Sequence, residues 1–211
     1  MTSGYVCLAK ITKILLTRWF NPGFQAGFSS DNFIFVPAMP EIKILLLTAS
    51  AKIRMDLSEI LVEVVANGGS VSFMHPLSLE AADKFWQSSL AAVARGESVI
   101  LGAFDSGKLV GTVTLLLDCP PNQPHRAEIA KLMTRISYRR KGVAKLLMRA
   151  AERIAVEKKR TLLVLDTATD GGASKFYEEI GYNLVGEIPD YALKPQGGLT
   201  GTKIYWKRPE A

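Results

Sequence analysis

The middle of the sequence joins a strand-like stretch to a helix-like stretch through a short basic turn. Residues 127–134 read as a strand, and a helical repeat of apolar residues follows, which predicts a helix with its buried side at Val143, Leu146, Leu147, Ala150 and Ile154. The turn between them holds a glycine, Gly142, with cations around it at Arg139, Arg140, Lys141, Lys145 and Arg149. A strand that runs through a turn into an amphipathic helix is typical of α/β domains, which excludes an all-helical or an all-β fold.

The patterns on either side of this stretch predict further strands and helices. Strands are predicted at 41–49, 99–104, 109–117, 161–167, 182–188 and 201–207, and helices at 53–65, 79–93 and 173–180. Asn67-Gly68-Gly69 ends the first helix, and Asp105-Ser106-Gly107-Lys108 indicates a hairpin. Ser78 caps the second helix, whose inward residues are predicted to be Leu79, Ala82, Trp86, Leu90 and Val93. The sequence therefore predicts a mixed-sheet α/β domain without internal repeats.

Composition excludes several classes of protein. The 211 residues are 48% hydrophobic and 22% charged, which is a globular composition, and the net charge of +6 favours anionic partners in general. The two cysteines, Cys7 and Cys119, form no CxxC pair, and the two histidines have no helical ligand spacing, so we expect no metal. There is no G-x-S-x-G motif and no apolar run long enough to span a membrane, so we expect no membrane partner and a cytoplasmic location.

Residues 1–38 differ from the rest of the chain. Their cations Lys10, Lys13 and Arg18 outnumber a single acid, Asp31. Two interpretations stay open: an organellar targeting segment, or a poorly ordered extension upstream of a translation start at Met39. We therefore divide the chain into this extension and a main domain over 39–211.

Residues 102–108 imitate a nucleotide-binding loop. They match the G-x-x-x-x-G-K part of a P-loop, but the next residue is Leu109 rather than Ser or Thr. The glycines also flank a hairpin, and no helix follows. A hairpin without nucleotide is the better interpretation.

The turn before residue 143 fits an anion site better. The start of a helix presents unpaired backbone N–H groups and a partial positive charge, and Gly142 and Ala144 are small enough for close approach of a phosphate. The alternative is structural: Gly142 shapes a loop and the cations form a solvated helix face. The strand–turn–helix order favours phosphate binding.

Two motifs in order make the sequence similar to the GNAT superfamily of N-acetyltransferases. Arg139-x-x-Gly142-x-Ala144 resembles the [QR]-x-x-G-x-[GA] motif, and residues 173–182, ASKFYEEIGY, resemble the A-x-x-F-Y-x-x-x-G-[FY] block. The likeness covers about residues 44–207. It implies a mixed, mostly antiparallel sheet of six to seven strands flanked by about four helices. One departure is Arg140, where Gly is common in the family; its side chain either reaches toward CoA phosphates or weakens binding.

The resemblance implies acetyl-CoA as co-substrate and names the residues that would hold it. These are Leu132, Met133 and Thr134 on the strand, and Arg139, Arg140, Lys141, Gly142, Val143 and Ala144 in the turn. It also implies that the sheet splays after this strand, and that a backbone N–H near Met133 or Thr134 polarises the thioester carbonyl.

Three side chains are the catalytic candidates. Tyr177 matches the family's general acid, and a phenol with a pKa near 10 can protonate a thiolate. An amine acceptor needs a base at neutral pH; Glu128 is the first candidate and Asp166 the second. The structural alternatives are a half-buried aromatic at Tyr177, an ion pair of Glu128 with Arg126 or Lys131, and a loop hydrogen bond from Asp166.

The leading hypothesis for function is an acetyl-CoA-dependent N-acetyltransferase of a small amine. Within the family the sequence is most similar to the tabtoxin-resistance acetyltransferases, which implies a tabtoxinine-like β-lactam amino acid as acceptor and a role in resistance. A protein or peptide acceptor is the alternative; an enclosed pocket would favour the small molecule and an open groove the polypeptide. A basic nucleic-acid-binding domain ranks last, because the helix after Gly142 buries one face and no aromatics interleave its cations, so we expect no nucleic acid. A homodimer is left open.

Overall fold

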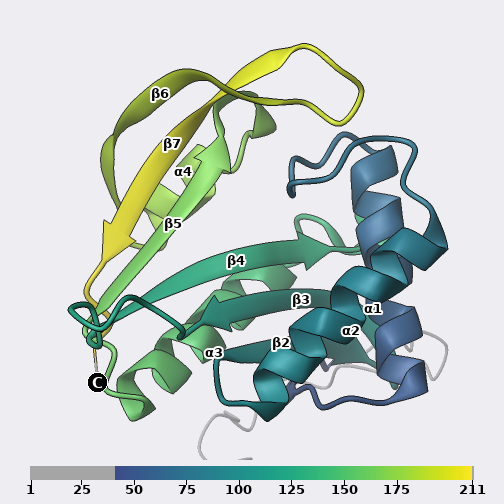
Figure 1. The fold of residues 1–211 in the computed structure, drawn as a ribbon, viewed down its shortest axis with the longest axis horizontal. Coiled ribbons are helices and arrows are strands. Elements are labelled where there is room, and N and C mark those ends of the chain that lie inside the picture. The colour runs from purple at the N-terminus through teal and green to yellow at the C-terminus, as the bar shows by residue number, and fades with distance from the viewer. Residues whose placement is uncertain (1–40, 211) are drawn as a thin grey trace, which may run out of the picture. The chain divides into compact units, whose positions relative to one another are not determined.

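A seven-stranded sheet organises residues 41–210, the part of the chain that the computed structural model describes (Figure 1). The expected extension at 1–38 lies outside the described residues. The strands are β1 Lys43–Leu46, β2 Ser98–Asp105, β3 Lys108–Leu116, β4 Arg126–Thr134, β5 Leu162–Ala168, β6 Asn183–Leu193 and β7 Leu199–Lys207. Their order is β1-β2-β3-β4-β5-β7-β6, and every neighbouring pair is antiparallel except β4 and β5. This confirms the predicted mixed, mostly antiparallel sheet.

Four α-helices cover the two faces of the sheet. They are α1 Ala51–Ala66, α2 Leu79–Ala94, α3 Val143–Glu157 and α4 Ser174–Glu179, with short 3₁₀ turns at Ile136–Tyr138 and Thr169–Gly171. Successive strand residues point to opposite faces, so Leu101 and Ala103 of β2 belong to a core with α3, whereas Ile100, the residue before Leu101, belongs to a core with α1 and α2. The sheet is thus packed on both sides.

Most of the predicted helix signals are confirmed. Ser78 Oγ accepts a hydrogen bond from Ala81 N at 3.1 Å, as predicted, and Ser50 caps α1 in the same way through Ile53 N. The predicted inward positions of Leu79 and Leu146 are wrong, since these residues are 43% and 39% exposed. In α3 the buried stripe is instead turned toward Met148, Ala151 and Ala155.

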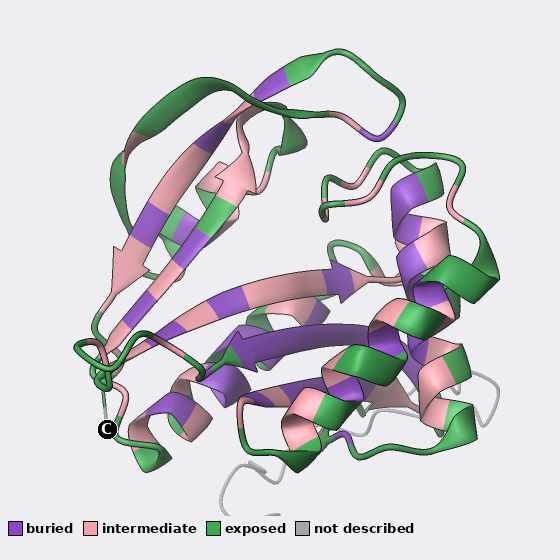
Figure 2. Ribbon diagram, viewed as in Figure 1, coloured by how far each residue is buried: buried purple, intermediate pink, exposed green. Residues whose placement is uncertain are grey.

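Close packing of α3 on β3 depends on a glycine. A Cβ at Gly111 would lie 2.9 Å from Met133 O and 3.1 Å from Val143 Cγ1, closer than side chains tolerate. The missing side chain lets the first turn of α3 lie directly on the sheet, next to the end of β4. Figure 2 shows the result: β3 is buried along nearly its whole length, while the edge strand β6 is exposed.

Strand β4 carries two irregularities that shape the middle of the sheet. Its register with β3 shifts, because Thr112 pairs with Met133 but Thr114 pairs with Ala130, so Lys131 and Leu132 both lie opposite one residue. On its other edge β4 pairs with β5 only over Arg126–Glu128, and the strands then diverge (Figure 1). The sheet therefore opens into a wedge, as expected.

Candidate functional site

The wedge between β4 and β5 leaves backbone groups of β4 without a strand partner. Arg135 N donates to Val110 O of β3 at 2.9 Å. Because successive amides of a strand point to opposite edges, the Thr134 N–H faces the wedge, whereas that of Met133 faces β3. The sequence analysis expected the N–H of Met133 or of Thr134 to polarise the thioester carbonyl. Of these two, only the Thr134 N–H points into the wedge, where a thioester could accept from it.

The turn before α3 provides a second set of free backbone donors. Gly142 is the N-cap residue, with a φ of 79°, and no side chain caps the helix. The first intrahelical bond runs from Leu146 N to Gly142 O at 3.1 Å, so the N–H groups of residues 143–145 have no partner within the helix. A Cβ at Gly142 would meet nothing within 4 Å, so the space beside this residue is open. The arrangement suits a phosphate.

The five cations predicted around this turn are exposed, at Arg139, Arg140, Lys141, Lys145 and Arg149. Arg140 has a φ of 60°, in the left-handed region where glycine is favoured. The Lys141 ammonium lies 5.0 Å from the centre of the Tyr138 ring, and the Tyr138 hydroxyl donates to Asp105 at 2.7 Å. These contacts tie one side of the basic turn to the β2–β3 hairpin.

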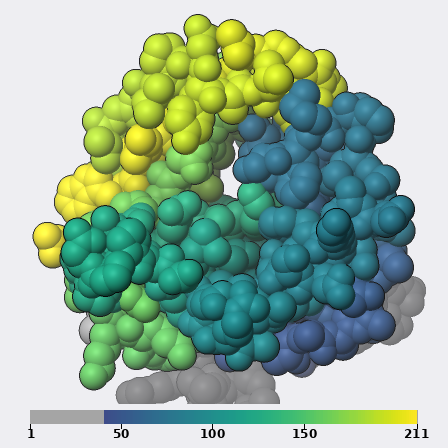
Figure 3. Space-filling model, viewed as in Figure 1, coloured from purple at the N-terminus to yellow at the C-terminus, as the bar shows by residue number. Residues whose placement is uncertain are grey.

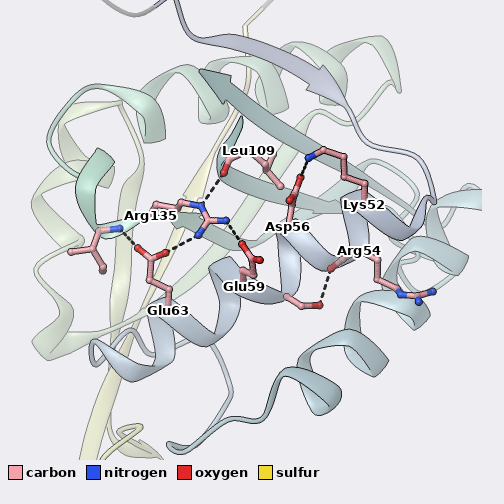
Figure 4. Close-up of polar contacts among 9 residues, drawn as sticks. Lys52, Arg54, Asp56, Glu59, Glu63, Leu109 and Arg135 are labelled. Atoms are coloured by element: carbon pink, nitrogen blue, oxygen red, sulfur yellow. Dashed lines mark hydrogen bonds and ion pairs between the residues drawn. The ribbon is translucent and has the colours of Figure 1, made fainter. Parts of the chain in front are cut away.

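A buried arginine that the sequence analysis missed fixes the end of β4 (Figure 4). Arg135, whose side chain is 11% exposed, forms ion pairs with Glu59 at 2.8 Å and Glu63 at 3.0 Å, and its Nε donates to Leu109 O at 3.0 Å. Glu63 also accepts from Ile136 N at 2.7 Å. The i, i+4 spacing of Glu59 and Glu63 places both acids on one face of α1, which could have indicated a shared cationic partner. The spacing does not indicate that this partner is Arg135.

Tyr177 lies in α4 with its ring buried and 7% of the residue exposed. Its ring centre is 5.8 Å from that of Tyr205 and 5.9 Å from that of Tyr182. Burial, and then the charge of Asp166, raise the pKa of Tyr177 to about 12. The phenol is thus held in its protonated form.

The two carboxylate candidates line one cavity of about 210 Å³. Glu128 of β4 pairs with Arg126 at 3.7 Å but keeps a side chain that is 41% exposed. Asp166 of β5 accepts a hydrogen bond from Thr202 Oγ1 of β7 at 3.0 Å, not from the loop that follows β5. The other lining residues are Val164, Leu165, Tyr191, Thr202 and Ile204. The structure thus brings Glu128 and Asp166 together at the point where β4 and β5 begin to diverge.

The turn between β6 and β7 bridges the wedge to α1. Pro195 O accepts from His75 N at 2.8 Å, and Gln196 Nε2 donates to Val65 O and Ala66 O, each at 3.3 Å. We call this turn, residues 194–198, the strap. Figure 3 shows an opening through the molecule between the strap side and the α1–α2 segment. The wedge is therefore a bounded opening and not a groove along the surface.

A larger cavity of about 360 Å³ lies elsewhere, between α3, α4 and β7. Its lining includes Lys145 and Arg149, but none of the catalytic candidates. Within residues 41–210 no cluster of three or more metal-ligating side chains occurs, and no helix is both long and apolar enough to cross a membrane.

Comparison with known proteins shows which family the sequence matches and which solved structures share the fold. The model of the acetyltransferase (GNAT) family matches residues 69–182, more than half of the chain. The structure resembles a ribosomal-protein-alanine N-acetyltransferase from Brucella melitensis at 18% identity and a TM-score of 0.65, over 78% of this chain and 99% of that one.

Two further structures share this fold. One is yncA from Salmonella typhimurium, solved with its cofactor acetyl-CoA: 12% identity, TM-score 0.65, over 79% of this chain and 94% of that one. The other is a proposed phosphinothricin N-acetyltransferase: 18% identity, TM-score 0.64, over 80% of this chain and 100% of that one. At such identities the likeness establishes the fold.

Proposed function

The chain belongs to the acetyltransferase (GNAT) family and is an acetyl-CoA-dependent acyltransferase; from this premise we propose that its acceptor is the amine of a small molecule. The observation that carries the proposal is the strap, whose bonds from Pro195 and Gln196 to the α1 side bound the wedge. A polypeptide acceptor would need an open groove, whereas the strap limits the opening beside Glu128 and Asp166 on one side.

The residues around the wedge fit acetyl-CoA. The uncapped N–H groups at the start of α3 and the open space beside Gly142 would receive its diphosphate, with Arg139, Arg140 and Lys141 adding positive charge. The unpaired edge of β4, including the amide of Thr134, would hold its pantetheine arm as an added strand does.

Each catalytic candidate then has one task. Acetyl-CoA supplies a thioester, whose acetyl carbon bonds to the amine nitrogen as its bond to sulphur breaks. Thr134 N–H donates to the carbonyl oxygen, where negative charge develops. Tyr177, kept protonated by its raised pKa, gives its proton to the departing sulphur. Glu128 takes the proton of the amine, directly or through water, and Asp166 is the second candidate for this step.

The finer part of the proposal concerns the acceptor. The sequence likeness favours a tabtoxinine-like β-lactam amino acid and a role in toxin or antibiotic resistance. The structural neighbour described as a phosphinothricin N-acetyltransferase supports a small acceptor, and the neighbour described as a ribosomal-protein-alanine N-acetyltransferase supports the alternative, a protein or peptide.

An acetyl-CoA consumption assay tests the proposal. Purified protein is given panels of small amines, amino acids and peptides with free N-termini, and kcat/KM is measured for each. We expect turnover with small acceptors and at most weak turnover with peptides. Turnover of peptides alone would overturn the small-molecule acceptor. The pH profile of kcat/KM is then compared between Glu128→Gln and Asp166→Asn on the best acceptor. The base is the carboxylate whose replacement abolishes the fall of kcat/KM at low pH.

A further inference from the structure

Lys131 is the most unusual residue of the wedge. It lies in the register shift of β4 and has a φ of 51°, in the left-handed region. Regular alternation would place it on the α3 side of the sheet with Ile129, two residues before it. Instead its side chain reaches Ser72, Phe73 and Phe85, which belong to α2 and the segment before it. The bulge thus turns Lys131 to the face of the sheet that α1 and α2 cover.

The Lys131 ammonium has neutral neighbours at contact distance. Nζ donates to Ser72 Oγ at 3.1 Å and lies 5.9 Å from the centre of the Phe73 ring and 5.8 Å from that of Phe85. Within residues 41–210 it forms no ion pair, although the charges of Asp166 and Glu128 act on it from farther away. Burial lowers the pKa of Lys131, while the two carboxylates and the two rings favour its charged form.

We propose that Lys131 is a specificity-determining residue that binds an anionic group of the acceptor. This inference rests on the proposed function and adds a second charge to the acceptor: an amine directed at Glu128 and Asp166, and an anion directed at Lys131. A half-buried cation without a close counter-ion gains strongly from such a charge-assisted bond. A simple alkylamine would leave Lys131 unpaired and would be repelled by it. The acceptor class is therefore a small zwitterion.

The competing role for Lys131 is that of the base, as a neutral amine. Two observations disfavour it. The two phenylalanine rings attract a cation and not a neutral amine, and the charges of Asp166 and Glu128 also favour the cation, although burial is the larger effect and leaves the pKa of Lys131 below its ordinary value. The two roles also differ in kinetics: a base affects kcat for every acceptor, whereas an anion-binding residue affects KM for anionic acceptors only.

Matched acceptors test the inference on the wild-type protein. β-Alanine, 4-aminobutyrate and 6-aminohexanoate are compared with the alkylamines in which a methyl group replaces the carboxylate, and L-lysine is compared with cadaverine. 3-Aminopropylphosphonate distinguishes a phosphonate from a carboxylate. For the pairs that the enzyme acetylates best, we expect kcat/KM of the anionic member to be about 10- to 100-fold higher than that of its counterpart without the anionic group. Equal turnover of both members would overturn the inference while leaving the small-molecule acceptor intact.

Variants of Lys131 test whether this residue causes the preference for anionic acceptors. Lys131→Met is expected to lose it through a higher KM for the anionic acceptors, with kcat for alkylamines kept, and Lys131→Arg is expected to keep most of it. Lys159→Met is the control, because Lys159 is an exposed lysine with a similar φ of 58° at the end of α3. If Lys131→Met lowers kcat equally for both members of a pair, Lys131 is a base and the inference fails. If no small amine of either kind is acetylated, the proposed function fails and the inference falls with it.

Discussion

Tyr177 is both a packed core residue and the proposed proton donor. Its ring is part of an aromatic cluster with Tyr182 and Tyr205, so Tyr177→Phe should keep the fold while it removes the proposed proton donor. We expect kcat to fall by about 10²- to 10⁴-fold with KM for acetyl-CoA nearly unchanged. Steady-state kinetics measures this. Tyr182→Phe, which removes a hydroxyl from the same cluster, is the control and should stay active; full kcat in Tyr177→Phe would rule out Tyr177 as the acid.

The protonation of Tyr177 can be measured separately. Because burial and Asp166 raise its pKa to about 12, the phenol should lose its proton well after an exposed tyrosine, whose pKa is near 10. The difference in tyrosinate absorbance between the wild type and Tyr177→Phe should therefore develop only above about pH 11. Asp166→Asn removes the negative charge that contributes to the raised pKa, so the absorbance change of Tyr177 should then occur at lower pH. A Tyr177 step near its ordinary value would contradict the buried, charge-coupled position.

At the scale of elements, the turn before α3 is defined by the backbone of Gly142. Its φ of 79° disfavours any side chain, so Gly142→Ala should cost about 1 kcal/mol in the free energy of unfolding. The new methyl group would also stand before the free amides of α3, so we expect a clear rise in the Kd of CoA, measured by calorimetry.

Gly96 provides the matched control for this prediction. It has a φ of 77° and the same open surroundings, but it lies after α2 and away from the turn. Gly96→Ala should lose a similar stability with no change in CoA affinity. If both variants bind CoA as the wild type does, the turn is not the diphosphate site.

The connection of β4 to α1 depends on Arg135. Arg135→Met would leave Glu59 and Glu63 without their partner and the end of β4 less firmly held, and we expect a loss of about 1–3 kcal/mol in the free energy of unfolding. KM for acetyl-CoA should rise as well, since Thr134 precedes this residue. Denaturant unfolding and kinetics measure the two effects.

Arg54→Met is the comparison for Arg135. The Arg54–Asp83 pair joins α1 to α2 but is more exposed, so its loss should cost less than about 1 kcal/mol. Equal effects of the two substitutions would show that the Arg135 network adds no more than a surface ion pair.

At the scale of the whole molecule, the strap connects the last hairpin to the first helix. Gln196→Ala removes both side-chain bonds to α1, and we expect a several-fold higher KM for the acceptor with KM for acetyl-CoA unchanged, because the strap bounds only the acceptor side. Lys194→Ala is the control: Lys194 lies in the same turn but pairs with Asp170, not with α1. An unchanged acceptor KM in Gln196→Ala would show that the strap does not limit the acceptor site.

The parts of the fold that follow from local patterns were predictable. Ser78 as a cap, the hairpin at residues 105–108 and the strand–turn–helix around Gly142 are each decided by neighbouring residues. The inward direction predicted for Leu79 and Leu146 was wrong, because the face that a helix buries is set by its contact with the sheet. Arg135 and Lys131 were not identified as part of the site, since the side chains to which they donate hydrogen bonds, Ser72, Glu59 and Glu63, are 59–76 residues away in the sequence.

The sequence by itself determined the order of strands and helices, the basic turn and the two motifs that assign the family, because these are properties of short segments. The tertiary structure alone decided which side chains meet. The wedge exists because β5 pairs with β4 for three residues and then diverges, and the strap closes one side because β6 and β7 extend as far as α1. The direction of Lys131 depends on one extra residue in the register of β4, which pairing with β3 fixes and no local pattern reveals.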